Sequence, residues 1–118
     1  MQCHARGLTD WPRWGFMIYY SLKLSAAPAH VEFVENGTTG ANCTGSASAP
    51  TAPAGYLCIY EGYQMNMATT FANRYWTYAP DGGEGSPSAS ASAYGAAMYG
   101  YFDSAGYYAW GTWAVTEP

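Results

Sequence analysis

The sequence predicts an all-β fold, an antiparallel β-sandwich or a jelly-roll-like barrel, in a single domain. Aromatic residues make up 18% of its 118 residues. Charged residues make up only 10%, against a usual share of about 25%, so a disordered chain is excluded. Short segments of alternating or β-branched and aromatic residues are separated by loops rich in Gly, Pro and Ser, and no amphipathic helix of normal length appears. We expect the sandwich over residues 16–118 and an N-terminal extension over residues 1–15.

The charge balance excludes several classes of partner. Four Lys and Arg stand against eight Asp and Glu, which gives a net charge of −4. Four scattered basic residues cannot neutralise a phosphate backbone, so nucleic-acid binding is disfavoured. No window reaches the roughly 18 apolar residues of a membrane span. The first residues also lack the apolar core of a signal peptide, and we therefore expect this chain to be part of a longer precursor.

The first two predicted strands cover Phe16–Leu24 and the segment that begins at His30. In the first strand the alternation places Ile18, Tyr20, Leu22 and Leu24 on one face. The segment Ser25–Pro28 ends it. In the second strand Val31 and Phe33 point inward, and Glu32 points outward. Glu35 shares the inward parity, so we expect this strand to end before it.

A disulfide between Cys43 and Cys58 is predicted next. Asn36-Gly37 indicates a turn, residues 38–55 have the composition of a loop, and Tyr56–Glu61 forms a strand that contains the second cysteine. Closing a loop of this length stabilises a domain by roughly 3 kcal/mol and indicates an oxidising compartment. Cys3 is left over. A zinc site is not expected, because no Cys-x-x-Cys is present and the two histidines, His4 and His30, stand apart.

The second half is predicted to contain four further strands. Tyr63–Phe71 alternates at period two, and Arg74–Tyr78 has high β-propensity. Residues 80–87 form a loop, and residues 88–93 alternate between Ser and Ala. Tyr94–Phe102 and Tyr107–Thr116 then flank Asp103–Gly106, which predicts a β-hairpin. On its second arm Tyr108, Trp110 and Thr112 share one face, whereas Trp113 and Val115 share the other. Because both faces are apolar, we expect burial by the second sheet and by another subunit. Glycines 95, 100 and 111 within the arms suggest aromatic rings over bare backbone, or bulges.

The order of several motifs resembles a set of uncharacterised actinobacterial-type secreted proteins, often with a collagen-like stalk. The resemblance spans roughly Tyr20 to Pro118 and is carried by the segments Ser21–His30, Asn42–Gly45, Ala52–Glu61 and Gly111–Thr116. It implies a secreted or cell-surface location, a C-terminal globular β-domain and, if that domain caps a stalk, a trimer. It implies no enzymatic activity. Residues 1–14 depart from the family pattern.

The search for catalytic chemistry in the sequence yields no catalytic residue, metal site or cofactor. Glu32, Glu35 and Glu61 could supply the carboxylate pair of a glycoside hydrolase, but solvent-facing or edge-strand charges are the simpler interpretation. No serine lies in a nucleophile-elbow pattern. Asp81 and Glu84 could hold calcium with loop carbonyls, although a plain turn explains them better.

Aromatic residues carry the functional hypothesis, a non-enzymatic extracellular structural or binding head domain. Their amphipathic rings suit protein interfaces and sugar stacking, although many are expected in the core. We expect a homo-oligomer, with a protein or a glycan as ligand. A carbohydrate-binding module and a phage or filament structural subunit are the alternatives. The candidate binding surface consists of Tyr56, Tyr60, Tyr63, Tyr75, Trp76, Tyr78 and Tyr107.

Overall fold

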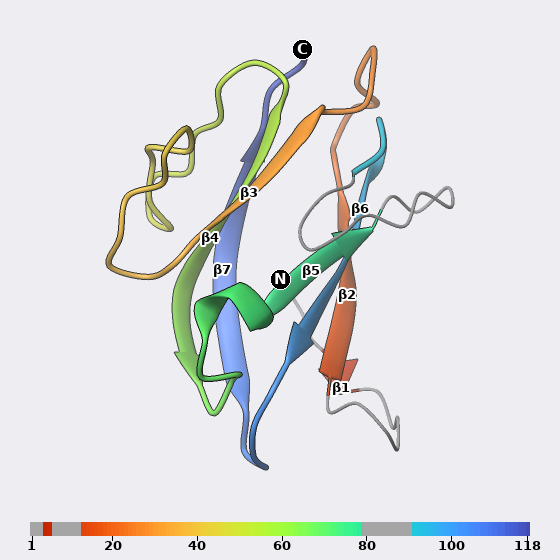
Figure 1. The fold of residues 1–118 in the computed structure, drawn as a ribbon. Helices are drawn as coiled ribbons and strands as arrows, with labels where there is room; N and C mark the ends of the chain where they lie inside the picture. Colours follow the sequence, from red (N-terminus) through yellow and green to blue (C-terminus); the bar gives the residue numbers. More distant parts are fainter. Residues whose placement is uncertain (1–3, 6–12, 79–90) are drawn as a thin grey trace.

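The computed structural model describes residues 4–5, 13–78 and 91–118, which form two facing β-sheets (Figure 1). One sheet has four strands in the order β1-β2-β6-β5, and the other has three in the order β3-β4-β7. The strands are β1 (His4–Ala5), β2 (Arg13–Tyr19), β3 (His30–Val34), β4 (Tyr56–Met65), β5 (Tyr75–Tyr78), β6 (Gly95–Tyr101) and β7 (Tyr108–Val115), and the single short helix of these ranges is the 3-10 turn η1 (Phe71–Asn73). The predicted all-β fold is confirmed, as an open sandwich and not a closed barrel.

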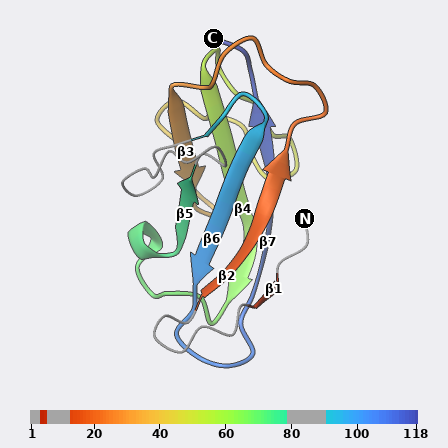
Figure 2. The ribbon, with the colours of Figure 1, turned by 90° about the vertical axis from the view of Figure 1, so that its right-hand side faces the viewer.

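The main core lies between the two sheets, which the perpendicular views of Figures 1 and 2 show as separate layers. Side chains from both sheets meet there, because every second residue of a strand points to the same face. The buried members are Ile18, Leu57, Ile59, Met67, Tyr75, Ala91, Ala96 and Met98. A second cluster lies on the opposite face of β4, beneath the loop of residues 35–55, and consists of Val34, Cys43, Cys58 and Tyr60.

The strands β3 and β4 pair in parallel, which corrects the expectation of a purely antiparallel sandwich. His30 lies opposite Tyr56 and Val34 opposite Tyr60. The predicted turn at Asn36-Gly37 does form, with Gly37 at a φ of 83°. The turn opens into the long loop instead of a hairpin, however, and a parallel neighbour requires such a crossover connection. The strand ends at Val34, before Glu35, as predicted.

The predicted C-terminal hairpin is wrong. β6 pairs with β2 and β5 in one sheet, whereas β7 pairs with β4 in the other, so the segment 102–107 crosses between the layers. The rings of Phe102 and Tyr107 stack on each other at a centroid distance of 3.9 Å and pack against the main core. The separation leaves β6 mostly buried, whereas Tyr108 and Trp110 on the outer face of β7 remain exposed, so the expected burial of both faces of this arm is not met within the described chain.

The boundaries of two predicted strands also differ from the prediction. β2 already begins at Arg13, and it ends at Tyr19, five residues before Leu24. Beyond it Leu22 is exposed, while Leu24 is buried and donates its N–H to the carbonyl of Ala93 (2.9 Å). The segment Tyr63–Phe71 continues β4 only to Met65 and then bends. The predicted loop at residues 80–87 lies outside the described residues, as does part of the Ser/Ala alternation.

Two glycines allow close approach within the sheet of β3, β4 and β7. A Cβ on Gly111 would collide with the carbonyl oxygen of Tyr60 on the neighbouring strand. A Cβ on Gly62 would collide with the ring of Trp110, which covers the irregular pairing between Glu61 and Tyr63. At Gly111 the close neighbour is backbone and not the ring that was predicted there, and the glycine that lies under a ring is Gly62, which the prediction did not name. In the described part of the chain, no helix has the length and apolar character to cross a membrane.

Candidate binding surfaces

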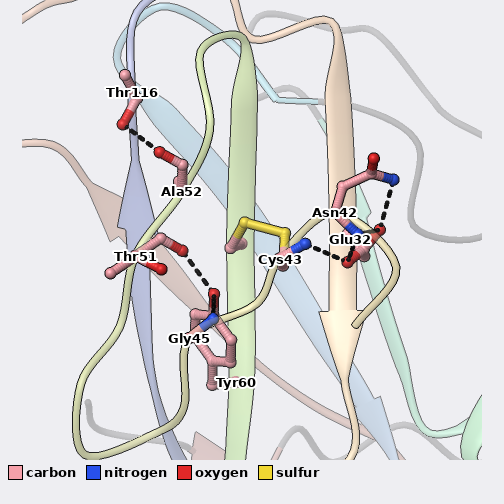
Figure 3. Close-up of a disulfide and its surroundings, with 9 residues drawn as sticks. Glu32, Asn42, Cys43, Gly45, Thr51, Ala52, Tyr60 and Thr116 are labelled. Atoms are coloured by element: carbon pink, nitrogen blue, oxygen red, sulfur yellow. Dashed lines mark hydrogen bonds between the residues drawn. A yellow bond between two sulfur atoms is a disulfide. The ribbon is translucent and has the colours of Figure 1, made fainter. Parts of the chain in front are cut away.

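The predicted disulfide joins Cys43 to Cys58 and fixes the long loop to the outer face of β4 (Figure 3). The two Cα atoms are 5.6 Å apart, and both residues are fully buried. On one side of the bridge, the carboxylate of Glu32 accepts hydrogen bonds from the backbone N–H groups of Cys43 (2.7 Å) and Asn42 (3.2 Å). Glu32 lies on the edge strand β3, in line with the edge-strand interpretation, and its carboxylate in addition orders the loop.

Tyr60 holds the other side of the same loop. Its hydroxyl accepts a hydrogen bond from the N–H of Gly45 (3.1 Å) and donates one to the carbonyl of Thr51 (2.5 Å), as Figure 3 shows. Only 1% of Tyr60 is exposed. Its place in the predicted binding surface is therefore corrected: the buried hydroxyl pairs with two backbone groups of the loop and holds the loop on β4.

A buried ionic cluster connects the two sheets at their β3 and β5 edges. The guanidinium Nη1 of Arg74 lies 3.3 Å from Glu61 and 3.1 Å from Glu35. The Glu61 carboxylate also accepts hydrogen bonds from the Tyr75 hydroxyl (2.5 Å) and the Asn36 backbone N–H (3.2 Å). Glu61 is 7% exposed, so the interpretation as a solvent-facing charge is wrong for this residue. Its burial is stabilised by these partners, because an unpaired buried carboxylate is costly.

Arg74 also fixes the backbone that leads from β4 to η1. Its Nε donates to the carbonyl of Ala68 (2.7 Å), and its Nη2 donates to that of Thr69 (3.4 Å). The guanidinium thus connects two carboxylates to two main-chain carbonyls, and its planar donor geometry suits such a role. The consequence is a defined position for residues 68–70.

The seven predicted surface aromatics do not gather on one face. Tyr75 is 6% exposed and belongs to the core, which corrects its assignment, as for Tyr60. Tyr56 stacks on His30, and Tyr107 stacks on Phe102, so both are half-buried. Tyr63 is exposed. Trp76 is half-buried beside two grooves, and the side chain of Tyr78 lies outside the described residues.

An exposed aromatic patch occupies the end of the β4–β7 surface that the disulfide loop leaves open. It comprises Tyr63, Met65, Tyr108 and Trp110, of which each is 44–51% exposed, and we call it the β4–β7 patch. Tyr63 lies opposite Trp110, and Met65 lies opposite Tyr108. The alternation on the second arm had placed Tyr108 and Trp110 together. The sequence did not predict that Met65 lies beside these two rings, because the register between β4 and β7 decides it.

A groove of about 610 Å³ lies beside η1, between the segment of residues 68–73 and the side chains of β5 and β6. A second groove of about 470 Å³, between the edges of β3 and β5, shares Asn73 and Trp76 with it. Volumes of about 300–1,000 Å³ are typical of small-molecule sites. The first groove is lined by Thr69, Thr70, Asn73, Trp76, Tyr101 and Asp103, and we call it the Trp76 groove.

The described residues contain no cluster of three or more His, Cys, Asp or Glu that could hold a metal ion. No protein-family model, curated protein or solved structure matches the chain. The arrangement of its own residues is therefore the basis for a functional proposal.

Proposed function

We propose that this chain is a non-catalytic extracellular head domain that associates with a second copy of itself through the β4–β7 patch. The observation that carries the proposal is the exposure of four large side chains on adjacent strands. Exposed clusters of aromatic and Met side chains are enriched at protein interfaces. Isolated exposed rings would need no such explanation.

Self-association is favoured over binding of a charged partner by the chemistry of the patch. None of Tyr63, Met65, Tyr108 and Trp110 carries a charge. A closed symmetric interface places the same surface on both subunits, and an uncharged patch can face itself without repulsion. Among the described strands β7 pairs only with β4, so it also lies at an edge of its sheet. Backbone groups at a sheet edge favour pairing with another strand.

The extracellular location is supported by the disulfide, since such bonds persist mainly in oxidising compartments. It is also what the resemblance to secreted β-domains implies. A structural role without catalysis is supported by the use of Glu32, Glu35 and Glu61 in contacts within the domain. Each of these carboxylates orders a loop or neutralises Arg74.

Sedimentation velocity over a range of concentrations tests this proposal. We expect the wild type to form a discrete oligomer, and the double variant Tyr63→Thr/Tyr108→Thr to be monomeric. Threonine retains β-propensity, and both rings are exposed, so the fold is expected to persist. The matched control is Tyr19→Thr, which removes an exposed ring from β2. A wild type that stays monomeric at all concentrations, or equal weakening by the control, would refute the proposal.

A further inference from the structure

We infer that the Trp76 groove binds a neutral saccharide, independently of self-association at the β4–β7 patch. The groove combines two aromatic side chains with two hydroxyls, one amide and one carboxylate. A sugar ring presents apolar C–H faces and a rim of hydroxyls, so both kinds of lining have a partner on the same ligand. Small-molecule sites in general combine apolar walls with a few placed polar groups.

The aromatic part of the groove is a corner formed by Trp76 and Tyr101. Their ring centroids are 6.1 Å apart and their planes are inclined at 75°. This edge-to-face contact fixes both side chains against each other. Trp76 is a lining residue of both grooves. An extended oligosaccharide could therefore contact the same residue from the Trp76 groove and from the neighbouring groove.

The polar part is held in position before a ligand arrives. Thr69 donates its hydroxyl to the Asp103 carboxylate (2.7 Å), and the Asp103 N–H donates to the carbonyl of Asn66 (2.9 Å). Arg74 donates hydrogen bonds to the carbonyls of Ala68 and Thr69 and so fixes the backbone next to the groove. A carboxylate accepts about four hydrogen bonds, so Asp103 retains acceptor capacity for sugar hydroxyls. A rigid site loses less entropy when it binds.

The charge of the lining selects among ligand classes. Asp103 is acidic, and the lining includes no basic residue, which disfavours phosphorylated and carboxylated ligands. The hydroxyl, amide and carboxylate groups along the rim disfavour a purely apolar ligand, since they would lose water without gaining partners. A single carboxylate, already bonded by Thr69, is a poor cation site. A neutral polyhydroxylated ring satisfies all three conditions.

Amide chemical-shift titration of the full chain tests the inference, with cellotriose, chitotriose and mannotriose as probes and inorganic phosphate as the anionic comparison. We expect at least one trisaccharide to give saturable shifts confined to residues 68–76 and 101–103. Asp103→Asn, which preserves shape, should weaken that binding about tenfold by removing a charge-assisted hydrogen bond. Trp76→Phe should weaken it by reducing ring contact, whereas Trp110→Phe at the β4–β7 patch should leave it unchanged.

Asn73→Ala provides a variant that does not touch the core, because the side chain of Asn73 is exposed. It should weaken binding and leave the unfolding midpoint unchanged. The inference is overturned if no trisaccharide shifts these amides at about 10 mM, the weak limit of useful affinity. It is equally overturned if phosphate alone does so, or if the Asp103 and Asn73 variants bind as the wild type does.

Discussion

Arg74, between η1 and β5, reaches Glu61 on β4, and their side chains meet at 3.3 Å while both residues are buried. The contact joins the two sheets at their β3 and β5 edges, where Glu35 completes the cluster from the end of β3. The two carboxylates differ in exposure: the Glu61 side chain is 2% exposed and that of Glu35 is 39% exposed. This difference in exposure determines how much each carboxylate contributes to the free energy of unfolding.

Removing the buried carboxylate should cost far more than removing the exposed one. Glu61→Gln leaves the Arg74 charge with one partly solvated partner, and we expect a loss of about 3 kcal/mol in the free energy of unfolding. Glu35→Gln, the matched control, should cost less than about 1 kcal/mol, since solvent screens that pair. Urea denaturation of both variants measures the difference. Equal losses would show that the cluster does not act through burial.

Removal of the disulfide should destabilise the domain without unfolding it. Closure of a 15-residue separation contributes about 3 kcal/mol in the chain-entropy model, so Cys43→Ala/Cys58→Ala should lose about that much. The loop keeps its hydrogen bonds from Tyr60 to Thr51 and from Thr116 to Ala52. Amide shifts of β4 should therefore remain native-like in the variant. A loss of all native shifts would mean that the bridge is required for the fold itself.

Thr77→Val should stabilise the protein. Thr77 is fully buried, and its hydroxyl has no hydrogen-bond partner among the residues that the structure describes. Valine has nearly the same shape, so the change removes an unsatisfied polar group and should add about 1 kcal/mol to the free energy of unfolding. Thr112→Val is the control, because its hydroxyl donates to the carbonyl of Ala47 (2.6 Å) and its loss should destabilise by a similar amount. Opposite signs in thermal unfolding are expected, and equal signs would contradict the interpretation.

Stability should fall at alkaline pH because of Tyr20. Burial raises the pKa of its hydroxyl from 10.0 to about 12. Between these values the unfolded state has lost the proton that the folded state retains, so the free energy of unfolding decreases as the pH rises, by at most about 1.4 kcal/mol per pH unit from this group. The contribution is fully present below pH 10 and is lost toward pH 12.

Tyr20→Phe should reduce this alkaline slope. It should also stabilise the protein slightly at neutral pH, since the buried Tyr20 hydroxyl has no hydrogen-bond partner in the described part of the chain. Urea denaturation at several pH values from 9 to 11 measures both effects. Tyr19→Phe, on an exposed side chain of the same strand, is the control and should keep the wild-type slope. An unchanged slope in Tyr20→Phe would assign the alkaline loss to other groups.

Local information in the sequence was sufficient for the strands and for the disulfide. Alternation and β-propensity act over a few residues, and they correctly indicated strands around Ile18, Val31, Leu57 and Trp76. The spacing of Cys43 and Cys58 within a loop and an adjacent strand indicated their pairing. The glycine at position 37 marked a turn because its positive φ is unfavourable for other residues.

The choice of strand partners required the tertiary structure. The segments that become β6 and β7 each satisfy the pattern of a hairpin arm, yet they pair in different sheets. The abundance of amphipathic rings predicted that Tyr60, Tyr63 and Tyr75 belong to a binding surface. Their burial depends on what covers them: a disulfide-bound loop over Tyr60, the second sheet over Tyr75 and, over Tyr63, no other part of the described chain.

The sequence by itself determined that this chain is an all-β domain that is poor in charged residues and has a disulfide-bonded loop. It could do so because composition, hydrophobic period and cysteine spacing are properties of residues close in the sequence. Only the tertiary structure decided where the polar and aromatic groups meet. Glu61 faces Arg74, Trp76 and Tyr101 form a corner beside Asp103, and Trp110 covers Gly62. These contacts join residues from different strands and loops, and strand register and sheet packing set them through long-range burial, which no short sequence pattern encodes.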